Sequence, residues 1–273
     1  MDDLIATITQ LTQQQSTLPF AVYSSFHEQT LVNVPIARPL LIFVLSGEKE
    51  LGREPRSRCQ KGEFVFLSDS YAIDIRNIPR DKPYFALILE FDAADFSDLP
   101  TIVEDRLAYF IGTTGLELQQ WLQQFVQIAS WAPAAMIALR KRELLALLFH
   151  LGYTAVTRMK GKPTISQKIN DLFRANRFQD ISVEDLCARL AMSDSTLRRK
   201  LRQEQTSVMA IKDRARLGHG LHLLQTTDDS INLISDRCGY QSQSRFTQRF
   251  KAQFGLTPTE LRKTRKSSVE PPP

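Results

Sequence analysis

The sequence contains few of the side chains that form disulfides and metal centres. Of its 273 residues, only three are cysteine and four are histidine. The cysteines lie far apart, at Cys59, Cys187 and Cys238, so neither a disulfide framework nor a Cys-x-x-Cys zinc site is expected. Only His27 lies in the strand-rich part of the chain, which is too little for a metal enzyme that needs several histidine ligands. We therefore expect no metal, no cofactor and no enzymatic activity.

Long apolar runs are also missing. No segment approaches the ~18 apolar residues that a transmembrane helix needs. The first residues, Met1-Asp2-Asp3, are acidic where a signal peptide is basic. We expect a soluble, cytoplasmic protein without a membrane partner.

The charge is unevenly distributed along the chain. The formal net charge is +5, but residues 1–160 carry 15 basic and 18 acidic side chains, whereas residues 161–273 carry 20 and 12. The two parts therefore have net charges of −3 and +8. At about 100–200 residues per domain, the length predicts two domains. The basic excess of the second part indicates nucleic acid or an anionic surface as its partner.

The first part begins with short runs that are typical of β-strands. They are rich in β-branched and aromatic residues and are separated by Gly, Pro, Asp and Ser. The expected strands are Phe20–His27, Pro39–Leu45, Glu63–Leu67, Tyr71–Ile75 and Tyr84–Phe91. Ser46-Gly47-Glu48 and Lys61-Gly62 are expected to form hairpin turns. Strands of this number and length predict a sandwich or a small barrel.

Apolar residues recur at helical spacing after Asp92, and predict helices over Leu99–Ile111, Leu116–Ser130 and Pro133–Arg158. Pro133 suits a helix N-terminus, where its missing N–H is not needed. The last helix has a wide apolar face made by Leu139, Leu144, Leu145, Leu147, Leu148 and Leu151. We expect these helices to cover the barrel, and the last one to pack also on its twin in a homodimer.

The basic part contains two segments with the pattern of a helix-turn-helix unit, at residues 183–204 and 231–254. In the first, Ser182 is the expected N-cap of a short helix and Ser193 that of a second. Leu197 and Leu201 are four residues apart and must face inward. Ser195, Arg198, Arg199 and Arg202 then remain on the outer face, where arginine offers paired donors to guanine and phosphate.

In the second segment, Ser230 is the expected N-cap and Gly239 suits the left-handed position that ends the first helix. Phe246, Phe250 and Phe254 recur every four residues and are expected in the core. The side chains left for DNA are Gln243, Ser244, Arg245, Gln248, Arg249 and Lys251. Glutamine suits adenine edges, and the cations suit phosphate or guanine.

These residues carry a specific resemblance. The run Cys238-Gly239-Tyr240-x-x-x-Ser244-x-Phe246-x-x-x-Phe250-Lys251-x-x-Phe254-Gly255-x-x-Pro258-x-x-Leu261-Arg262 resembles the signature of the AraC/XylS family of transcription regulators. The resemblance covers about 100 residues, 165–265. It implies a seven-helix DNA-binding domain in which a long helix, about Val208–Leu224, joins the two units. Both recognition helices would then enter the major groove about one helical turn, ~34 Å, apart.

The resemblance assigns base-facing positions to both recognition helices. In the first unit these are Ser195, Arg198 and Arg199, and in the second they are Gln243, Ser244, Arg245 and Gln248. Together with their neighbours, the expected DNA-binding residues are Ser193, Ser195, Thr196, Arg198, Arg199, Arg202, Gln241, Ser242, Gln243, Ser244, Arg245, Gln248, Arg249 and Lys251. The partner is double-stranded operator or promoter DNA, and the family implies RNA polymerase as a second partner.

The chain departs from the family pattern at three positions. Leu261 replaces an aromatic residue, which exchanges one apolar group for another. Gly220 stands where a small alanine is usual, and Gly218 is not expected in the joining helix. Because two glycines in a helix interior cost about 1–2 kcal/mol together, we hypothesise that this helix is pliant. His219 and His222 share a helix face, but no other metal ligand lies near them in the sequence.

The strand-rich part resembles, more loosely, the cupin-like amino-terminal domain of the same family. Pro39–Gly47 and Pro83–Asp92 carry this likeness, which implies a sensor or dimerisation module. A barrel of this size can hold a small ligand between its sheets. The inward-facing candidates are Phe43, Leu45, Phe64, Phe66, Phe85 and Ile88, with Arg38 or Arg76 as anchors for an anion.

The fold class is therefore expected to be α+β: a cupin-like β-barrel with covering helices, then an all-α domain with two helix-turn-helix units. The expected organisation is a sensor domain at 1–158 with its helical part at about 93–158, a linker at 159–164, a DNA-binding domain at 165–265 and a tail at 266–273. The expected function is sequence-specific transcription regulation, as an activator controlled by a small molecule or partner. Two alternatives stay open: an architectural DNA-binding protein without a switch, and a cupin enzyme.

Overall fold

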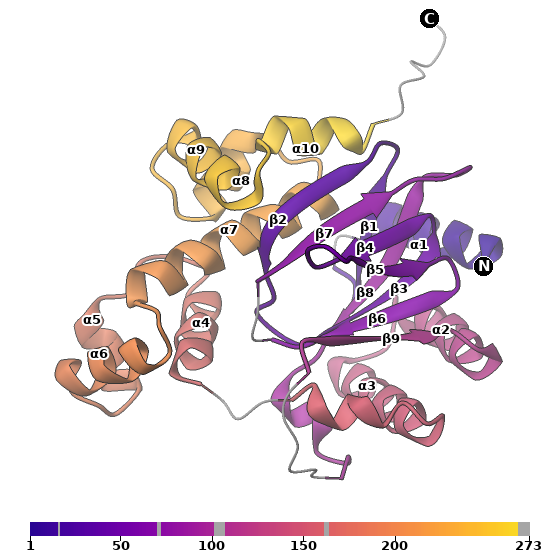
Figure 1. Ribbon diagram of the computed structural model, residues 1–273, viewed down its shortest axis with the longest axis horizontal. Coiled ribbons are helices and arrows are strands. Elements are labelled where there is room, and N and C mark those ends of the chain that lie inside the picture. The colour runs from indigo at the N-terminus through magenta and orange to yellow at the C-terminus, as the bar shows by residue number, and fades with distance from the viewer. Residues whose placement is uncertain (16, 70–71, 101–106, 161–163, 267–273) are drawn as a thin grey trace, which may run out of the picture. The chain divides into compact units, whose positions relative to one another are not determined.

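The computed structural model describes residues 1–15, 17–69, 72–100, 107–160 and 164–266. The chain divides into two compact units. The first comprises residues 1–30, 38–161 and 264–273, and the second comprises residues 31–37 and 162–263. Parts of the expected helix over Leu99–Ile111, of the linker and of the tail lie outside the described residues. Figure 1 shows the helices and strands of both units.

The strands of the chain form two antiparallel sheets. One sheet has five strands in the order β1-β8-β3-β6-β9, and the other has four in the order β2-β7-β4-β5. The five-stranded sheet consists of β1 (Ala21–Ser25), β8 (Tyr84–Glu90), β3 (Leu40–Ser46), β6 (Glu63–Leu67) and β9 (Tyr109–Thr113). The four-stranded sheet consists of β2 (Gln29–Pro35), β7 (Ala72–Ile78), β4 (Glu48–Leu51) and β5 (Ser57–Gln60). The fold is thus cupin-like, with two sheets in place of one closed barrel.

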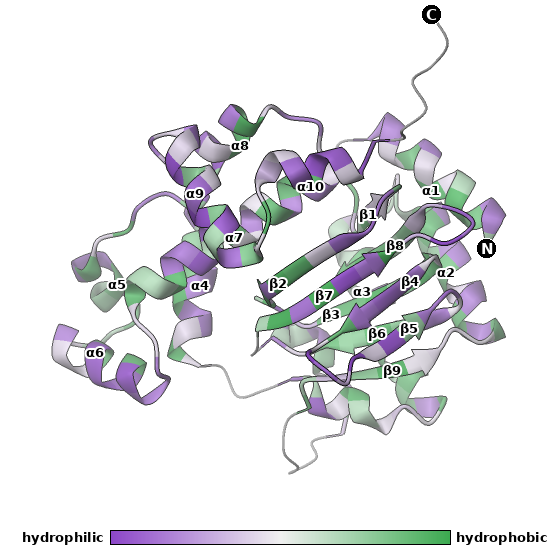
Figure 2. Ribbon diagram, turned by 45° about the horizontal axis from the view of Figure 1, so that its top comes forward, coloured by the Kyte–Doolittle hydropathy of each residue, from purple (hydrophilic) through white to green (hydrophobic). Residues whose placement is uncertain are grey.

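One face of the five-stranded sheet packs on helices. Its partners are α1 (Asp2–Gln14), α2 (Leu116–Ile128) and α3 (Ala134–His150). Leu4 and Ile8 of α1, Phe125 of α2 and Leu144 of α3 belong to one buried cluster with the sheet residues. The green strands β3 and β8 in Figure 2 supply the apolar surface for this cluster. The expectation that helices cover the sheet is confirmed.

Two expected hairpin turns are wrong. Gly47 follows β3, which pairs with β6 and β8, but it precedes β4, which pairs with β5 and β7. Gly62 likewise leads from β5 in one sheet to β6 in the other. Both glycines have positive φ, 75° and 87°. They therefore turn the chain from one sheet to the other, which local sequence does not distinguish from a hairpin.

The helical region after Asp92 also differs from the expectation. The structure has a short 3-10 helix, Ala93–Phe96, and residues 109–113 form strand β9 and no helix. The α3 helix ends at His150, before Gly152 at φ 91°. A second 3-10 helix, Thr154–Arg158, follows. The periodicity was present at these positions, but pairing with β6 decided the strand.

The second unit is helical throughout its described residues after 163. It contains α4 (Ile165–Ala175), α5 (Val183–Arg189), α6 (Asp194–Gln203), α7 (Val208–Thr226), α8 (Ile231–Arg237), α9 (Gln243–Phe254) and α10 (Pro258–Thr264). The seven helices that the resemblance implied are therefore present. The joining helix α7 is continuous through Gly218 and Gly220.

Among the described residues, none of the helices has the length and the apolar character that crossing a membrane requires.

Candidate nucleic-acid interface

The first helix-turn-helix unit is built on a shared apolar core. Leu186 of α5 and Leu197 of α6 are fully buried, and Leu201 of α6 is 2% exposed. They pack with Ile169 and Phe173 of α4 in one cluster. The inward direction predicted for Leu197 and Leu201 is confirmed. It turns the rest of α6 outward, so that the helix is mostly hydrophilic in Figure 2.

Two serines set where the helices of this unit begin. The Ser182 hydroxyl accepts a hydrogen bond from the backbone N–H of Asp185 at 3.0 Å. The Ser193 hydroxyl accepts one from the N–H of Thr196 at 3.3 Å. Each satisfies a donor that a helix N-terminus leaves free. Both predicted caps are confirmed.

A contact that the sequence did not suggest ties α6 to the start of α4. The carboxylate of Glu204, just after α6, accepts hydrogen bonds from the N–H groups of Ile165 and Ser166 at 2.8 and 2.9 Å. A carboxylate at a helix N-terminus is favoured by both these hydrogen bonds and the helix dipole. Glu204 therefore fixes the far end of the recognition helix.

The predicted DNA-binding side chains of the first helix-turn-helix unit lie on the surface. Ser193, Ser195, Arg198, Arg199 and Arg202 are exposed, and Thr196 is half-buried. The Nε atom of Arg198 donates to Asp194 Oδ1 at 2.9 Å, one turn earlier on α6. This pairing raises the pKa of Arg198, so the guanidinium is oriented along the helix surface and stays charged.

The second helix-turn-helix unit has a core built in the same way, with aromatic side chains. Phe246, Phe250 and Phe254 of α9 are fully buried, and neighbouring rings in this row have centroids 5.5 and 4.6 Å apart. Ser230 caps α8 through the N–H of Leu233 at 3.2 Å. Gly239 has φ 74° and follows the end of α8. The predicted core row, cap and glycine turn are all confirmed, and Leu261 is buried as well.

The predicted DNA-binding residues of the second helix-turn-helix unit are all exposed. They are Gln241, Ser242, Gln243, Ser244, Arg245, Gln248, Arg249 and Lys251. One of them is engaged by the joining helix, because Arg249 forms an ion pair with Asp213 of α7. Arg245 has no ion-pair partner among the residues that the structure describes. Both units thus present polar and cationic side chains on the second helix of each pair.

The phenylalanines expected to line a ligand space lie on another face of the sheet. Phe43, Phe64 and Phe66 are fully buried in the cluster formed with the covering helices, and Phe85 packs against it. Successive strand residues point to opposite faces, so Ile88, between Leu87 and Leu89 of that cluster, faces the other way. This corrects the expected orientation: of the six candidates, Ile88 faces away from the helices.

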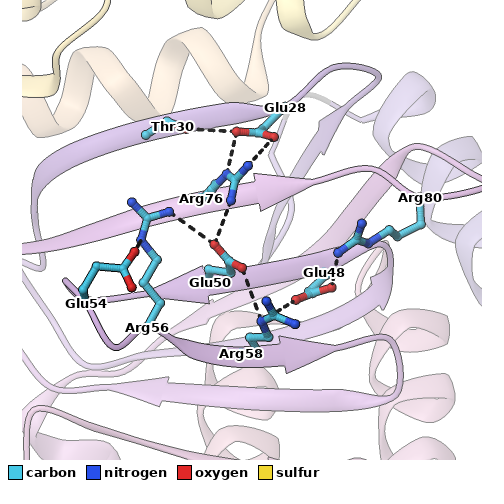
Figure 3. A network of polar contacts seen from close by, with 9 residues as sticks. All are labelled: Glu28, Thr30, Glu48, Glu50, Glu54, Arg56, Arg58, Arg76 and Arg80. Atoms are coloured by element: carbon cyan, nitrogen blue, oxygen red, sulfur yellow. Dashed lines mark hydrogen bonds and ion pairs between the residues drawn. The ribbon is translucent and has the colours of Figure 1, made fainter.

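The two predicted anion anchors are already paired with carboxylates. Arg38 forms an ion pair with Asp92. Arg76 lies between Glu28 and Glu50 on the four-stranded sheet, with its Nη2 atom 2.8 Å from Glu28 Oε2 and its Nη1 atom 3.1 Å from Glu50 Oε2 (Figure 3). These hydrogen bonds lower the pKa values of Glu28 and, against the opposing effect of burial, of Glu50.

The arginines and glutamates on and beside these strands pair with one another, so the charges largely compensate (Figure 3). The residues drawn with Arg76 and Glu28 include Glu48, Glu50, Glu54, Arg56, Arg58 and Arg80. An incoming anion would have to displace a carboxylate from Arg76. The Arg76 guanidinium is therefore already engaged within the protein.

A buried polar group between the sheets was missed in the sequence. Lys49 is 3% exposed, and its Nζ atom donates to Asn77 Oδ1 at 2.5 Å and lies 5.3 Å from the ring centroid of Tyr84. Burial lowers the pKa of Lys49 to about 7. The Tyr84 hydroxyl and the Ser25 hydroxyl are buried without a hydrogen-bond partner among the described residues. The segment Glu48–Leu51 is mostly charged, so nothing in the sequence indicated that Lys49 is buried.

No group of three or more His, Cys, Asp or Glu side chains with the arrangement of a metal site occurs among the described residues.

Comparison with solved structures gives the same architecture over most of the chain. The structure is similar to that of an apo ToxT variant from Vibrio cholerae, with a TM-score of 0.68 over 92% of this chain and 99% of that chain. It is also similar to wild-type ToxT with bound unsaturated fatty acid, with a TM-score of 0.66 over 94% and 99%. Sequence identity is 14% in both cases. At this identity the likeness concerns the fold.

Comparison with protein families and curated proteins concerns the second unit. Residues 186–264 match a family model described as a helix-turn-helix domain. The transcriptional regulator YdeO of Escherichia coli is 33% identical over 103 residues, which is 38% of this chain and 40% of YdeO. The transcriptional activator RhaS of Escherichia fergusonii is 27% identical over 158 residues, 56% of each protein. The matches thus span about half or less of these relatives.

The second unit is therefore a double helix-turn-helix domain of the AraC type. In this domain the chain resembles the AraC/XylS family, and the relatives YdeO and RhaS are transcription regulators.

Proposed function

We propose that the chain is a sequence-specific transcription regulator that binds operator DNA through α6 and α9. The observation that carries this proposal is the pair of capped helices whose inner faces are seated in apolar cores and whose outer faces present arginine and glutamine. Such a face offers donors to base edges and phosphates in the major groove. The proposed DNA-contacting residues are the fourteen predicted from the sequence, with Arg249 the least available because of Asp213.

Replacing Arg198 and Arg199 by alanine tests this proposal. Each bidentate contact to a base contributes about 1–3 kcal/mol of discrimination. We expect each variant to bind the operator about 10- to 100-fold more weakly than the wild type, and random DNA only slightly more weakly. The operator is first selected from random sequence with the full chain, and affinities are then measured by fluorescence anisotropy.

The matched control is Arg189→Ala, which removes an exposed arginine from α5 and leaves the recognition helix intact. It should bind the operator as the wild type does. Equal losses on operator and random DNA in the Arg198 and Arg199 variants would assign these arginines to phosphate contacts. If selection yields no preferred sequence, the chain is an architectural DNA-binding protein.

We propose a regulatory role for the first unit, with the space between its sheets as the place for a small effector. Support comes from Lys49 and Tyr84, whose polar groups face this interior, and from the fold, which ToxT shares in a structure with bound unsaturated fatty acid. Melting temperature is measured across a panel of fatty acids, sugars and other metabolites. A rise for one compound that is lost in Lys49→Met supports the site, and a rise that persists in Lys49→Met places the effector elsewhere.

We propose further that the protein acts as a homodimer and contacts RNA polymerase at its promoters. Support for the dimer comes from α3, where Leu144, Leu145 and Leu148 pack inward while Leu139 is 54% exposed. Sedimentation of the wild type and of Leu139→Glu tests it. A smaller mass for the variant is expected, and a monomeric wild type would refute the dimer.

A further inference from the structure

One buried arginine lies where the two helix-turn-helix units meet. Arg216 is near the middle of α7, the helix that joins the units (Figure 1), and is 7% exposed. Burying a guanidinium is costly unless its donors find partners. The identity of those partners therefore shows what the arginine holds together.

The first partners belong to the loop between α4 and α5. The Nε atom of Arg216 donates to the backbone oxygen of Phe178 at 2.9 Å, and its Nη2 atom is 3.3 Å from Asp180 Oδ1. Phe178 has φ 61°, and its ring stacks on His219, three residues after Arg216, at 4.2 Å between centroids. The joining helix thus holds this loop at two points.

The second set of partners belongs to the turn between α8 and α9. The guanidinium carbon lies 5.9 Å from the ring centroid of Tyr240, and that ring lies 5.4 Å from Phe246 of α9. Gly239 is so close that an added Cβ would lie 2.6 Å from Arg216 Nη2 and 2.8 Å from the Phe178 oxygen. The loop before α5, the joining helix and the turn before α9 therefore converge on one guanidinium.

We propose that Arg216 is a positioning residue that fixes the separation of recognition helices α6 and α9, and thereby the base-pair spacing between the two half-sites of the operator. This inference rests on the proposed DNA-binding function. Arg216 is buried and does not contact DNA. Its planar fork reaches two acceptors in the loop between α4 and α5 while its face contacts Tyr240 before α9, which a lysine ammonium cannot reproduce. Specificity for spacing would then arise away from the base-reading side chains.

The test compares DNA sites that differ only in spacing. The full chain binds the selected operator, the same operator with one to three base pairs inserted or deleted between half-sites, and each half-site alone. We expect the wild type to lose about tenfold or more in affinity when the spacing changes, in the range of a mismatched contact. Arg216→Lys should reduce this loss to about threefold or less, with unchanged affinity for an isolated half-site.

Asp180→Asn is measured beside it, because it weakens the same junction while leaving Arg216 buried. The matched control is Arg214→Lys, which makes the same exchange on the same helix at an exposed arginine bonded to Thr206. It should keep the wild-type spacing profile. Circular dichroism and thermal melting establish that each variant is folded.

The outcomes are distinct. A wild type with no preferred sequence refutes the proposed function and this inference with it. A wild type with a spacing preference that the folded Arg216 and Asp180 variants keep refutes the inference alone. Equal losses at every spacing and on single half-sites assign Arg216 to the stability of the domain, and also refute it.

Discussion

His219 is an example of a residue whose chemistry is set by what packs on it. The sequence placed it on a helix face with His222, with no other metal ligand nearby in the sequence. In the structure its ring stacks on Phe178, with an interplanar angle of 15°. Burial lowers the pKa of His219 to about 4, and the nearby His222, Arg174 and Arg237 act in the same direction. Its surroundings favour the neutral, stacked form.

The depressed pKa predicts acid sensitivity of the second unit. Between about pH 6.5, the ordinary value for histidine, and the folded pKa of about 4, the unfolded chain binds more protons than the folded chain. The free energy of unfolding therefore decreases as the pH falls through this window. His219→Phe keeps a ring on Phe178 and removes the proton site, so it should lose less stability from pH 7 to pH 4.5. Denaturant unfolding at each pH measures this, and parallel curves for both proteins would contradict it.

At the scale of elements, α7 depends on glycine for packing. An added Cβ on Gly220 would lie 2.8 Å from two ring carbons of Phe246 and 3.3 Å from Cys238 Sγ. Phe246 is fully buried between Tyr240 and Phe250. The ring therefore has no free direction in which to move. At Gly218 a Cβ would meet a single side-chain carbon within 4 Å, at 3.3 Å.

Gly220→Ala should therefore destabilise the protein although alanine favours helix. Overpacking costs about 1–3 kcal/mol, against a gain of about 1 kcal/mol in helix propensity. We expect a lower melting temperature, measured by calorimetry. Gly218→Ala is the comparison, with a smaller effect or a gain. A Gly218→Ala protein with unchanged stability and unchanged operator affinity would also refute the hypothesis that α7 is pliant.

At the scale of the whole molecule, the two parts of the chain differ in net charge and in how their cations are paired. Residues 1–160 have a net charge of −3 and residues 161–273 of +8. In the first part, arginines are paired with glutamates on the four-stranded sheet (Figure 3). In the second, Arg199, Arg202 and Arg245 have no ion-pair partner among the described residues. The helices proposed to bind DNA thus present cations that are free of ion pairs within the described residues.

This distribution predicts steep salt dependence of DNA binding by the full chain. Each neutralised phosphate contributes about 0.9 to the slope of log affinity against log salt. We expect Lys251→Gln to reduce the slope by about one, equally on operator and random DNA. Titrations from about 50 to about 200 mM salt measure it. A loss confined to the operator would instead assign Lys251 to base recognition.

The sequence by itself determined the second unit almost completely. Caps at Ser182, Ser193 and Ser230, the leucine pair of α6 and the phenylalanine row of α9 are local signals, because helix formation depends on neighbours within one or two turns. The outward position of Arg198, Arg199 and Gln243 followed from them. Glu204 and Arg216 did not follow, since their hydrogen-bond partners lie 36 or more residues away.

The first unit was decided by its tertiary structure. Strands β4, β5 and β9 are short or polar in sequence, and exist because they pair with strands elsewhere in the chain. Alternation places Phe64 and Phe66 on one face of their strand, but only the covering helices determine which face is theirs and that Phe43 shares it. For the same reason, the burial of Lys49 beside Tyr84 came from strands brought together in space. Helix formation depends on residues that are close in the sequence, whereas the buried and exposed faces of a sheet are decided only when the layers that cover it are in place.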